Sequence, residues 1–238
     1  MLKRYLHLVG YVVFGSLALI TLVATVVPLI PSKQWYVRIF DYPRLQTWTI
    51  AVLALSWYAV FYFKRGRNGY AYVVILVVAI VVQGYKAWPY TPLARKQVLW
   101  SEKTVDEATT VSLFICNVLQ KNAEYAKVLA AVNTYNPDIF ITTESDAVWQ
   151  HELREIEDRF PHRIAVPQSN TYGMHVYSKL PLREADVRYL VEPDIPSIRT
   201  AVQLRTGDWV MLYVVHPRPP VPTEASDTKE RDAELVMV

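Results

Sequence analysis

Two polar side chains follow predicted strands in the second half of the 238-residue sequence. Asn117 stands near the end of the apolar run in "VSLFICNVL", and Glu144 ends the run in "DIFITTE". Apolar residues at helical spacing separate the two runs, which predicts a β-α-β unit with parallel neighbouring strands. Both side chains are therefore expected at the carboxyl edge of one sheet, where ligands of α/β proteins bind.

A carboxylate and an amide oxygen are hard donors that suit Mg²⁺ or Mn²⁺, with water completing the coordination. Glu144 and Asn117 are thus candidate metal ligands. A structural interpretation stays open at this point. Asn117 could hydrogen-bond to a neighbouring loop, and Glu144 could cap the next helix or pair with a lysine.

The rest of the second half predicts one helix and several strands. The helix is expected over residues 148–159, and the strands over 174–179, 185–191, 200–205 and 209–216. "TGD" between the last two strands is typical of a hairpin turn. His216 ends the last strand, and such a histidine is more often a loop residue held by backbone groups. Cys116 is the only cysteine, so no internal disulfide can form, and we expect it to be a small buried apolar residue.

The first half has a different character. Residues 1–100 contain 11 Lys/Arg and one acid, whereas residues 101–238 contain 14 Lys/Arg and 21 Asp/Glu, so the second part carries 14 − 21 = −7. Three apolar stretches, at about 6–30, 45–63 and 69–85, approach the length of roughly 17–25 residues that crosses a bilayer. We therefore predict a transmembrane region over 1–88, followed by a linker over 89–106. A soluble bundle of three buried helices is the alternative.

The cations near these stretches predict an orientation. Lys3 and Arg4 precede the first stretch, and the loop "KRGRNG" separates the second from the third. The positive-inside rule places both in the cytoplasm and residues 107–238 on the other side. The expectation is a multi-pass protein of the bacterial cell membrane whose second half is periplasmic or extracellular.

Several runs in the second half resemble the endonuclease/exonuclease/phosphatase superfamily, and most closely its bacterial membrane-anchored members. The runs are "NVLQKN", "NPDIFITTE", "NTYGMHVYSKLPL", "PSIRTAVQL", "VMLYVVHPRPP" and "RDAEL". The resemblance covers about Val111 to Leu235. It implies a DNase I-like, four-layered α/β sandwich over 107–238 and a metal-dependent phosphodiesterase, phosphatase or nuclease.

The resemblance also implies roles for individual residues. Asn117 matches the asparagine beside the metal and the phosphate, and Glu144 matches the metal-binding glutamate. His216 matches the histidine that contacts the scissile phosphate. Ser178 matches a buried structural serine, and we expect His175 to be structural as well.

The family's "GDFN"-like and "SDH"-like motifs do not occur in this sequence. Residues 107–238 are therefore expected to be an incomplete N-terminal portion of the hydrolase domain, truncated and inactive as given. The alternative is a non-catalytic membrane protein whose α/β part binds a partner. A phosphoester substrate is implied, and the charge of −7 makes nucleic acid an unlikely ligand, because nucleic-acid-binding surfaces are basic.

Overall fold

The computed structural model describes residues 2–61, 67–98, 106 and 108–238. The chain divides into two compact units. The helical unit comprises Met1–Leu99 and Pro220–Asp227, and the α/β unit comprises Trp100–Pro219 and Thr228–Val238. The sequence of each unit is thus interrupted by part of the other.

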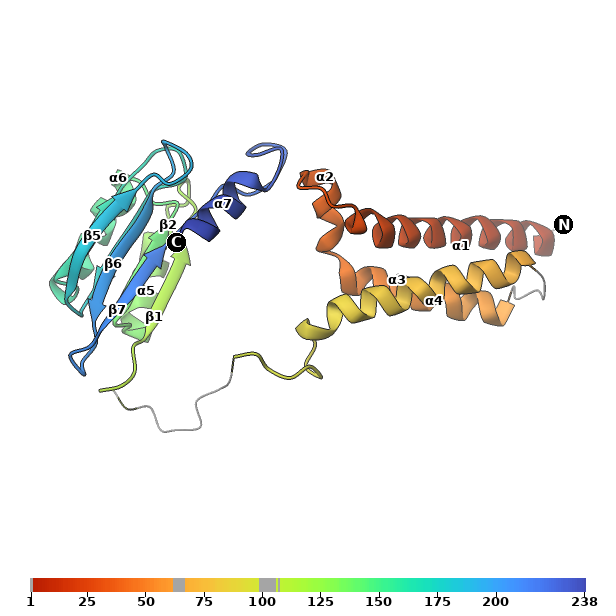
Figure 1. The fold of residues 1–238 in the computed structure, drawn as a ribbon, viewed down its shortest axis with the longest axis horizontal. Helices are drawn as coiled ribbons and strands as arrows, with labels where there is room; N and C mark the ends of the chain where they lie inside the picture. Colours follow the sequence, from red (N-terminus) through yellow and green to blue (C-terminus); the bar gives the residue numbers. More distant parts are fainter. Residues whose placement is uncertain (1, 62–66, 99–105, 107) are drawn as a thin grey trace. The chain divides into compact units, whose positions relative to one another are not determined.

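Three long helices pack together in the helical unit: α1 (Leu2–Val26), α3 (Arg44–Phe61) and α4 (Arg67–Ala87) (Figure 1). The buried residues where they meet are mostly small, which allows the helix backbones to approach closely. They are Ala18, Ala51, Ala54 and Leu76. Shorter elements connect the helices: η1 (Val27–Leu29), α2 (Trp35–Arg38) and η2 (Ile39–Asp41), and η3 (Trp88–Tyr90) follows α4.

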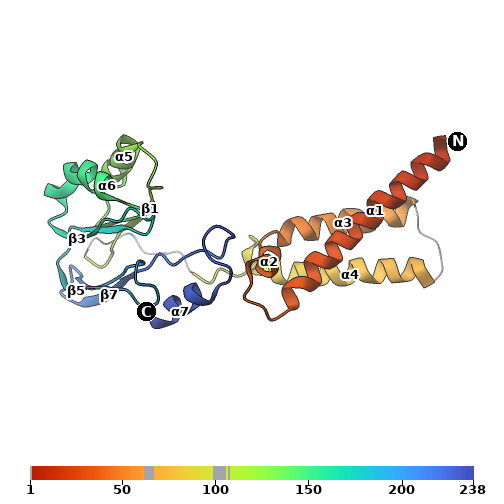
Figure 2. The same ribbon diagram turned by 90° about the horizontal axis from the view of Figure 1, so that it is seen from above.

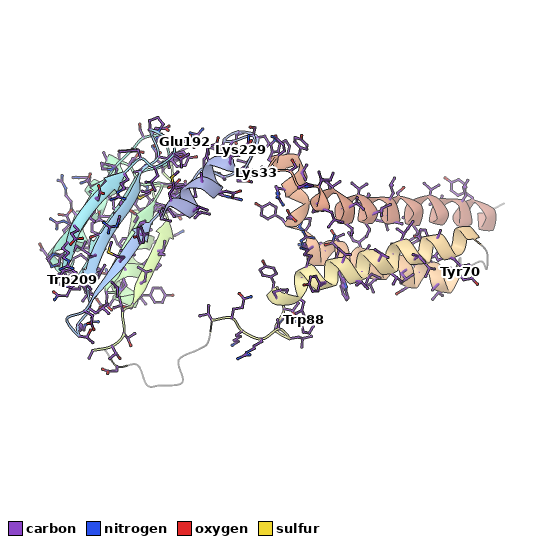
Figure 3. All side chains as sticks on the ribbon, in the orientation of Figure 1. Lys33, Tyr70, Trp88, Glu192, Trp209 and Lys229 are labelled. Carbon is purple, nitrogen blue, oxygen red and sulfur yellow. The ribbon has the colours of Figure 1, made fainter. Side chains whose placement is uncertain are left out.

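Among the described residues, two helical segments are long and apolar enough to cross a membrane: Leu8–Leu29 and Gly69–Tyr90. Only 22% of each segment is buried, and Tyr70 and Trp88 lie near the two ends of the second one (Figure 3). The sequence predicted a third span at 45–63. α3 occupies this region, but the polar residues of its first two turns shorten the apolar stretch, and residues 62–66 lie outside the described part. The predicted count of three spans is therefore not confirmed.

The side chain of Gln83 is fully buried between these helices. Gln83 Nε2 donates to Ala24 O and to Thr25 Oγ1, both at 3.1 Å, and Gln83 Oε1 accepts from Arg44 Nη1 at 3.3 Å.

Segment Pro220–Asp227, here called the strap, also belongs to this unit. Trp35 N donates to Ser226 O at 3.1 Å, and Gln34 forms an isolated bridge with Asp227.

The α/β unit contains two sheets. The first has the order β1 (Leu113–Asn117), β2 (Ile139–Thr143), β4 (Met174–Ser178), β3 (His162–Val166). β1 and β2 are parallel and are joined by α5 (Tyr125–Tyr135), so the predicted β-α-β unit is confirmed. The second sheet is antiparallel, in the order β5 (Leu182–Arg188), β6 (Ser197–Gln203), β7 (Trp209–Val214). Gly207, at φ 93°, makes the predicted hairpin turn.

The elements of the α/β unit stack in layers (Figure 2). α5, α6 (Ala147–Glu152) and η4 (Leu153–Arg159) cover one face of the first sheet, around the fully buried Phe140 and Trp149. The other face packs against the second sheet through Ile141, Val176 and Ile198. α7 (Lys229–Met237) meets the outer side of β6, where Ser197 Oγ donates to Glu234 Oε1 at 2.6 Å. This mixed α/β architecture is consistent with the predicted DNase I-like fold.

Candidate functional site

The structure brings Asn117 and Glu144 together at the carboxyl ends of β1 and β2. Asn117 is in register with Thr143, the residue before Glu144. Asn117 Nδ2 donates to Glu144 Oε1 at 2.6 Å. Glu144 has φ 59°, a left-handed conformation that is uncommon for a residue with a side chain. The chain thus turns sharply at the residue that carries the carboxylate.

His216 joins these two side chains from the second sheet. It lies two residues beyond β7, and its Nε2 is 3.6 Å from Glu144 Oε1. Its ring centroid lies 5.8 Å from that of the buried Tyr172. The side chains of His216 and Glu144 are 25% and 19% exposed, so a small ligand can still reach them. All three site residues predicted from the sequence therefore converge, although their roles stay predictions.

The surroundings keep His216 uncharged near neutral pH. Burial lowers the pKa of His216 from its usual 6.5, while the negative charges of Glu144 and Glu234 oppose this shift. A neutral imidazole donates one hydrogen bond and accepts another. His216 can therefore donate to an anionic ligand without carrying a full positive charge.

Asn117 orients the carboxylate. Its Oδ1 accepts from Leu119 N at 3.1 Å, while its Nδ2 is directed at Glu144. In the described part of the chain, the contacts of the Glu144 carboxylate involve Oε1, so Oε2 is available for a cation. The structural alternative for Glu144, a helix cap, is wrong: Asp146 caps α6, accepting from Val148 N and Trp149 N at 3.0 Å each.

The donor set limits the kind of metal that fits. No group of three or more His, Cys, Asp or Glu suited to metal binding occurs among the described residues. A closed site of the structural zinc type needs about four such ligands. A single carboxylate with neutral neighbours instead suits Mg²⁺, which usually keeps several waters and takes one or two protein carboxylates.

Sequence reasoning missed the loops that surround the site. Arg218, two residues after His216, donates from Nη2 to Glu192 Oε2 at 2.7 Å, and its guanidinium lies 5.9 Å from the Tyr172 ring. Figure 3 places Glu192 at this end of the sheets and Trp209, the first residue of β7, at the opposite end. Burial raises the pKa of Glu192, and Arg218 opposes this effect. The run "HPRPP" contains Arg218 but gives no sign of its partners.

Two further side chains connect these loops. Gln120 Nε2 donates to Ser169 O at 3.1 Å, and its Oε1 accepts from Thr171 N at 2.8 Å. Asn170 Nδ2 donates to Asp194 O at 2.9 Å. The loops after β1, before β4 and before β6 are thus linked around the site.

Two other predicted residues have structural environments. Ser178 is buried, and its Oγ donates to Leu180 O at 2.7 Å and accepts from Leu180 N at 3.0 Å, as expected of a structural serine. Cys116 is partly buried and packs against the core beneath α5, and burial raises the pKa of its thiol. Neither residue contributes to the site.

The part of the chain that carries this site also matches a known protein family. The sequence pattern of the Endonuclease/Exonuclease/phosphatase family matches residues 114–238, which is more than half of the chain. The chain belongs to this family. The match includes Asn117 at the end of β1, the whole of β2, and His216, so it contains all three converging side chains. A search of curated proteins gives no match.

Solved structures with a similar fold include other family proteins. A humanized TDP2 from D. rerio is 12% identical, with a TM-score of 0.45, and the alignment covers 53% of this chain and 54% of that one. An endonuclease/exonuclease/phosphatase from Beutenbergia cavernae is 15% identical, with a TM-score of 0.41 and coverage of 53% and 42%. TDP2 from C. elegans is 13% identical, with a TM-score of 0.42 and coverage of 83% and 58%. The chain thus spans about half the length of these structures.

Proposed function

We propose that this chain contributes to a membrane-anchored, metal-dependent phosphoester hydrolase. The observation that carries the proposal is the meeting of Asn117, Glu144 and His216, because Glu144 Oε1 lies 2.6 Å from Asn117 Nδ2 and 3.6 Å from His216 Nε2. Oxygen and nitrogen groups that converge at the ends of strands suit a cation and a phosphate together. Membership of the family supports the same chemistry.

Each residue has a proposed part in hydrolysis. Glu144, assisted by Asn117, holds Mg²⁺ or Mn²⁺ through its free oxygen. When bound, such an ion polarises a phosphoryl oxygen and stabilises the negative charge that develops on it. His216, neutral near pH 7, donates a hydrogen bond to a non-bridging phosphate oxygen. Asn117 keeps the Glu144 carboxylate in place and lies beside both the ion and the phosphate.

The proposed substrate is a phosphoester that is not part of a long nucleic acid. One solved D. rerio TDP2 structure is a complex with a single-strand DNA product. For this chain, the charge of −7 over residues 101–238 argues against binding to nucleic acid without sequence preference, because phosphate backbones attract cationic surfaces. We therefore favour substrates other than long nucleic acids.

The membrane part of the proposal rests on the two apolar helical segments and on the sequence. We propose that residues 1–88 anchor the chain through α1, α3 and α4, that 89–106 is a linker, and that 107–238 carries the hydrolase site. The cations near the N-terminus and in "KRGRNG" support a bacterial cell-membrane location with the site periplasmic or extracellular.

A binding experiment tests the site directly. Mn²⁺ is titrated into the purified full chain in detergent, and free Mn²⁺ is followed by its paramagnetic resonance signal. Glu144→Gln keeps the shape of the side chain but removes its charge, so we expect the affinity to fall by at least ~10-fold. Glu155→Gln removes an exposed acid of η4 and should change nothing.

The outcome separates the two candidate functions. A loss of affinity in Glu144→Gln alone supports the hydrolase proposal. Equal Mn²⁺ affinity in wild type, Glu144→Gln and Glu155→Gln would contradict it and favour the non-catalytic binding module. A further variant, His216→Ala, should leave the Mn²⁺ affinity nearly unchanged, because we assign His216 to the phosphate and not to the ion.

A further inference from the structure

Three polar side chains form a fully buried cluster around the turn that carries Glu144. They belong to Thr142, Ser145 and His175. His175 Nδ1 lies 2.6 Å from Ser145 Oγ and 3.2 Å from Thr142 Oγ1, and the two hydroxyl oxygens are 2.9 Å apart. Thr142 and Ser145 bracket the turn at Thr143 and Glu144. The polar contacts of His175 therefore reach both sides of the turn.

The backbone of this turn is attached to the loop before β4. Ser145 N donates to Gly173 O at 3.0 Å, and Ser145 Oγ donates to the same oxygen at 3.4 Å. A Cβ at Gly173 would stand 2.0 Å from Ser145 O, so only glycine permits this approach. Glu144 keeps its left-handed φ of 59° inside this attachment. Since that conformation is costly for a residue with a side chain, the surrounding contacts must hold it.

His175 is an unusual choice if its role were only to fill space. Its Nε2 is buried and has no hydrogen-bond partner in the described part of the chain. Burying a polar atom without a partner is unfavourable, and an apolar side chain would avoid that cost. The hydrogen-bond partners of His175 are Ser145 and Thr142. The free-energy cost of burying Nε2 is therefore offset by the hydrogen bonds that His175 makes at the turn of Glu144.

We propose that His175 is a positioning residue, which acts through Ser145 to hold the Glu144 carboxylate at Asn117 and His216. Its significance for metal binding rests on the function proposed above. The sequence predicts that His175 is structural, and the positioning role gives this residue a defined task at the site.

One tautomer satisfies the cluster. With the proton on Nδ1, His175 donates to Ser145 Oγ, and the Ser145 hydroxyl donates to Gly173 O. Nε2 then remains as a bare acceptor, which leaves no buried N–H without a partner. The ring stays neutral in this arrangement, because burial lowers the pKa of His175 to about 4, although the charge of Asp146 opposes the shift.

Two amide substitutions separate positioning from space filling. The side-chain nitrogen of asparagine can take the place of Nδ1, whereas that of glutamine can reach only the place of Nε2. Glutamine is closer to histidine in volume. A space-filling role therefore predicts that His175→Gln is the better tolerated variant, and a positioning role predicts His175→Asn.

Amide hydrogen exchange of the full chain in detergent tests the inference without any metal. In wild type and His175→Asn, we expect the peptide covering residues 143–146 to be protected. In His175→Gln and His175→Leu, its exchange should be at least ~10-fold faster, while peptides from β6 and β7 keep their protection as an internal control. Equal protection in all variants, or better protection in His175→Gln than in His175→Asn, would overturn the inference.

The Mn²⁺ titration then links the turn to the site. His175→Gln and His175→Leu should bind Mn²⁺ at least ~5-fold more weakly than wild type, and His175→Asn should restore most of the affinity. If Glu144→Gln leaves the Mn²⁺ affinity unchanged, the proposed function fails, and hydrogen exchange alone decides the positioning role. If Glu144→Gln weakens binding but His175→Leu does not, the positioning role is wrong.

Discussion

Glu144 illustrates how closely a reactive side chain depends on its immediate backbone. Its carboxylate meets Asn117 and His216 only because the chain turns through a left-handed conformation directly after β2. Ser145, buried and bonded to Gly173 O, stabilises that turn from the following position. The geometry of the site is therefore determined by residues that do not themselves face a ligand.

The buried His175 and the half-buried His216 predict a loss of stability in acid. The pKa of His175 in the folded chain is about 4, and that of His216 is also lowered, whereas an unfolded histidine has a pKa of 6.5. As the pH falls below 6.5, the unfolded chain binds protons first, so the free energy of unfolding decreases. The full contribution of His175 is about 3 kcal/mol, lost between about pH 6.5 and 4.

Thermal unfolding of the α/β unit in detergent from pH 7 to pH 4 measures this effect. His175→Leu lacks the titrating group, so its unfolding midpoint should fall less steeply with decreasing pH than that of wild type. Parallel pH profiles of the two proteins would show that His175 does not contribute to the acid sensitivity.

Sequence reasoning identified some site residues and missed others for physical reasons. Asn117 and Glu144 each follow an apolar run, so the periodicity of the strands indicates their position, whereas His216 was assigned to the site only by the family resemblance. Tyr172 and Arg218 lie in loops, where no periodicity exists, and their partners come from distant segments. The contact of His175 with Thr142 depends on the antiparallel register of β2 and β4, which the sequence does not specify.

The sequence predicts an element well where nearby residues, such as a proline, determine where the element begins or ends. α5 ends at Tyr135, and Asn136 adopts φ 44° before Pro137, because the residue before a proline is disfavoured in the helical conformation. The helix expected over 148–159 is instead a short α6 followed by the 3₁₀ segment η4, because its buried side chains, including Leu153 and Ile156, give the same apolar pattern in either conformation.

β5 differs more from its expected range. It spans Leu182–Arg188 and not 185–191. The register against β6 shifts between Arg183 and Asp186, and Glu184 has φ 53°. Such a bulge breaks the alternation of apolar and polar residues on which the prediction depended. β3 was not predicted at all, because its sequence, two polar residues followed by three apolar ones, shows no alternation.

The start of α6 supports a prediction at the element scale. Asp146 accepts from two backbone N–H groups of the first turn, which have no partner within the helix. Asp146→Ala should therefore lower the free energy of unfolding by about 1 kcal/mol. Denaturant unfolding of the full chain in detergent measures the change.

Two matched variants accompany this measurement. Asp146→Ser can still accept from the same N–H groups, so it should recover most of the lost stability. Asp158→Ala removes an exposed acid of η4 and should have no measurable effect. Equal destabilisation by Asp146→Ala and Asp146→Ser would show that the hydrogen bonds of the cap are not responsible.

For the whole molecule, the clearest expectation concerns the membrane. Leu8–Leu29 and Gly69–Tyr90 expose large apolar side chains along their length, which water would solvate poorly. We expect the chain to sediment with membranes and to stay there after washing with high salt and with alkaline carbonate. Release by salt alone would contradict this expectation and favour a soluble helical bundle.

The charge asymmetry of the sequence predicts the division of the chain into two unlike parts. Long apolar stretches beside cations indicate membrane helices whatever their packing, so the helical part is accessible to sequence reasoning. The burial of Gln83 could not be predicted from the sequence, because its partners come from α1 and α3. Contacts between helices depend on how each helix is rotated about its own axis. The composition of the sequence does not determine this rotation.

The strap has a consequence for how the protein can be divided. The chain passes from the helical unit to the α/β unit after Leu99, returns at Pro220, and leaves again after Asp227. Neither unit is one continuous stretch of sequence, and a fragment that starts at residue 100 carries the strap away from Gln34 and Trp35, its backbone partners. Cloning or proteolysis within the predicted linker, residues 89–106, therefore yields a piece with eight residues of the other unit still attached and unsupported.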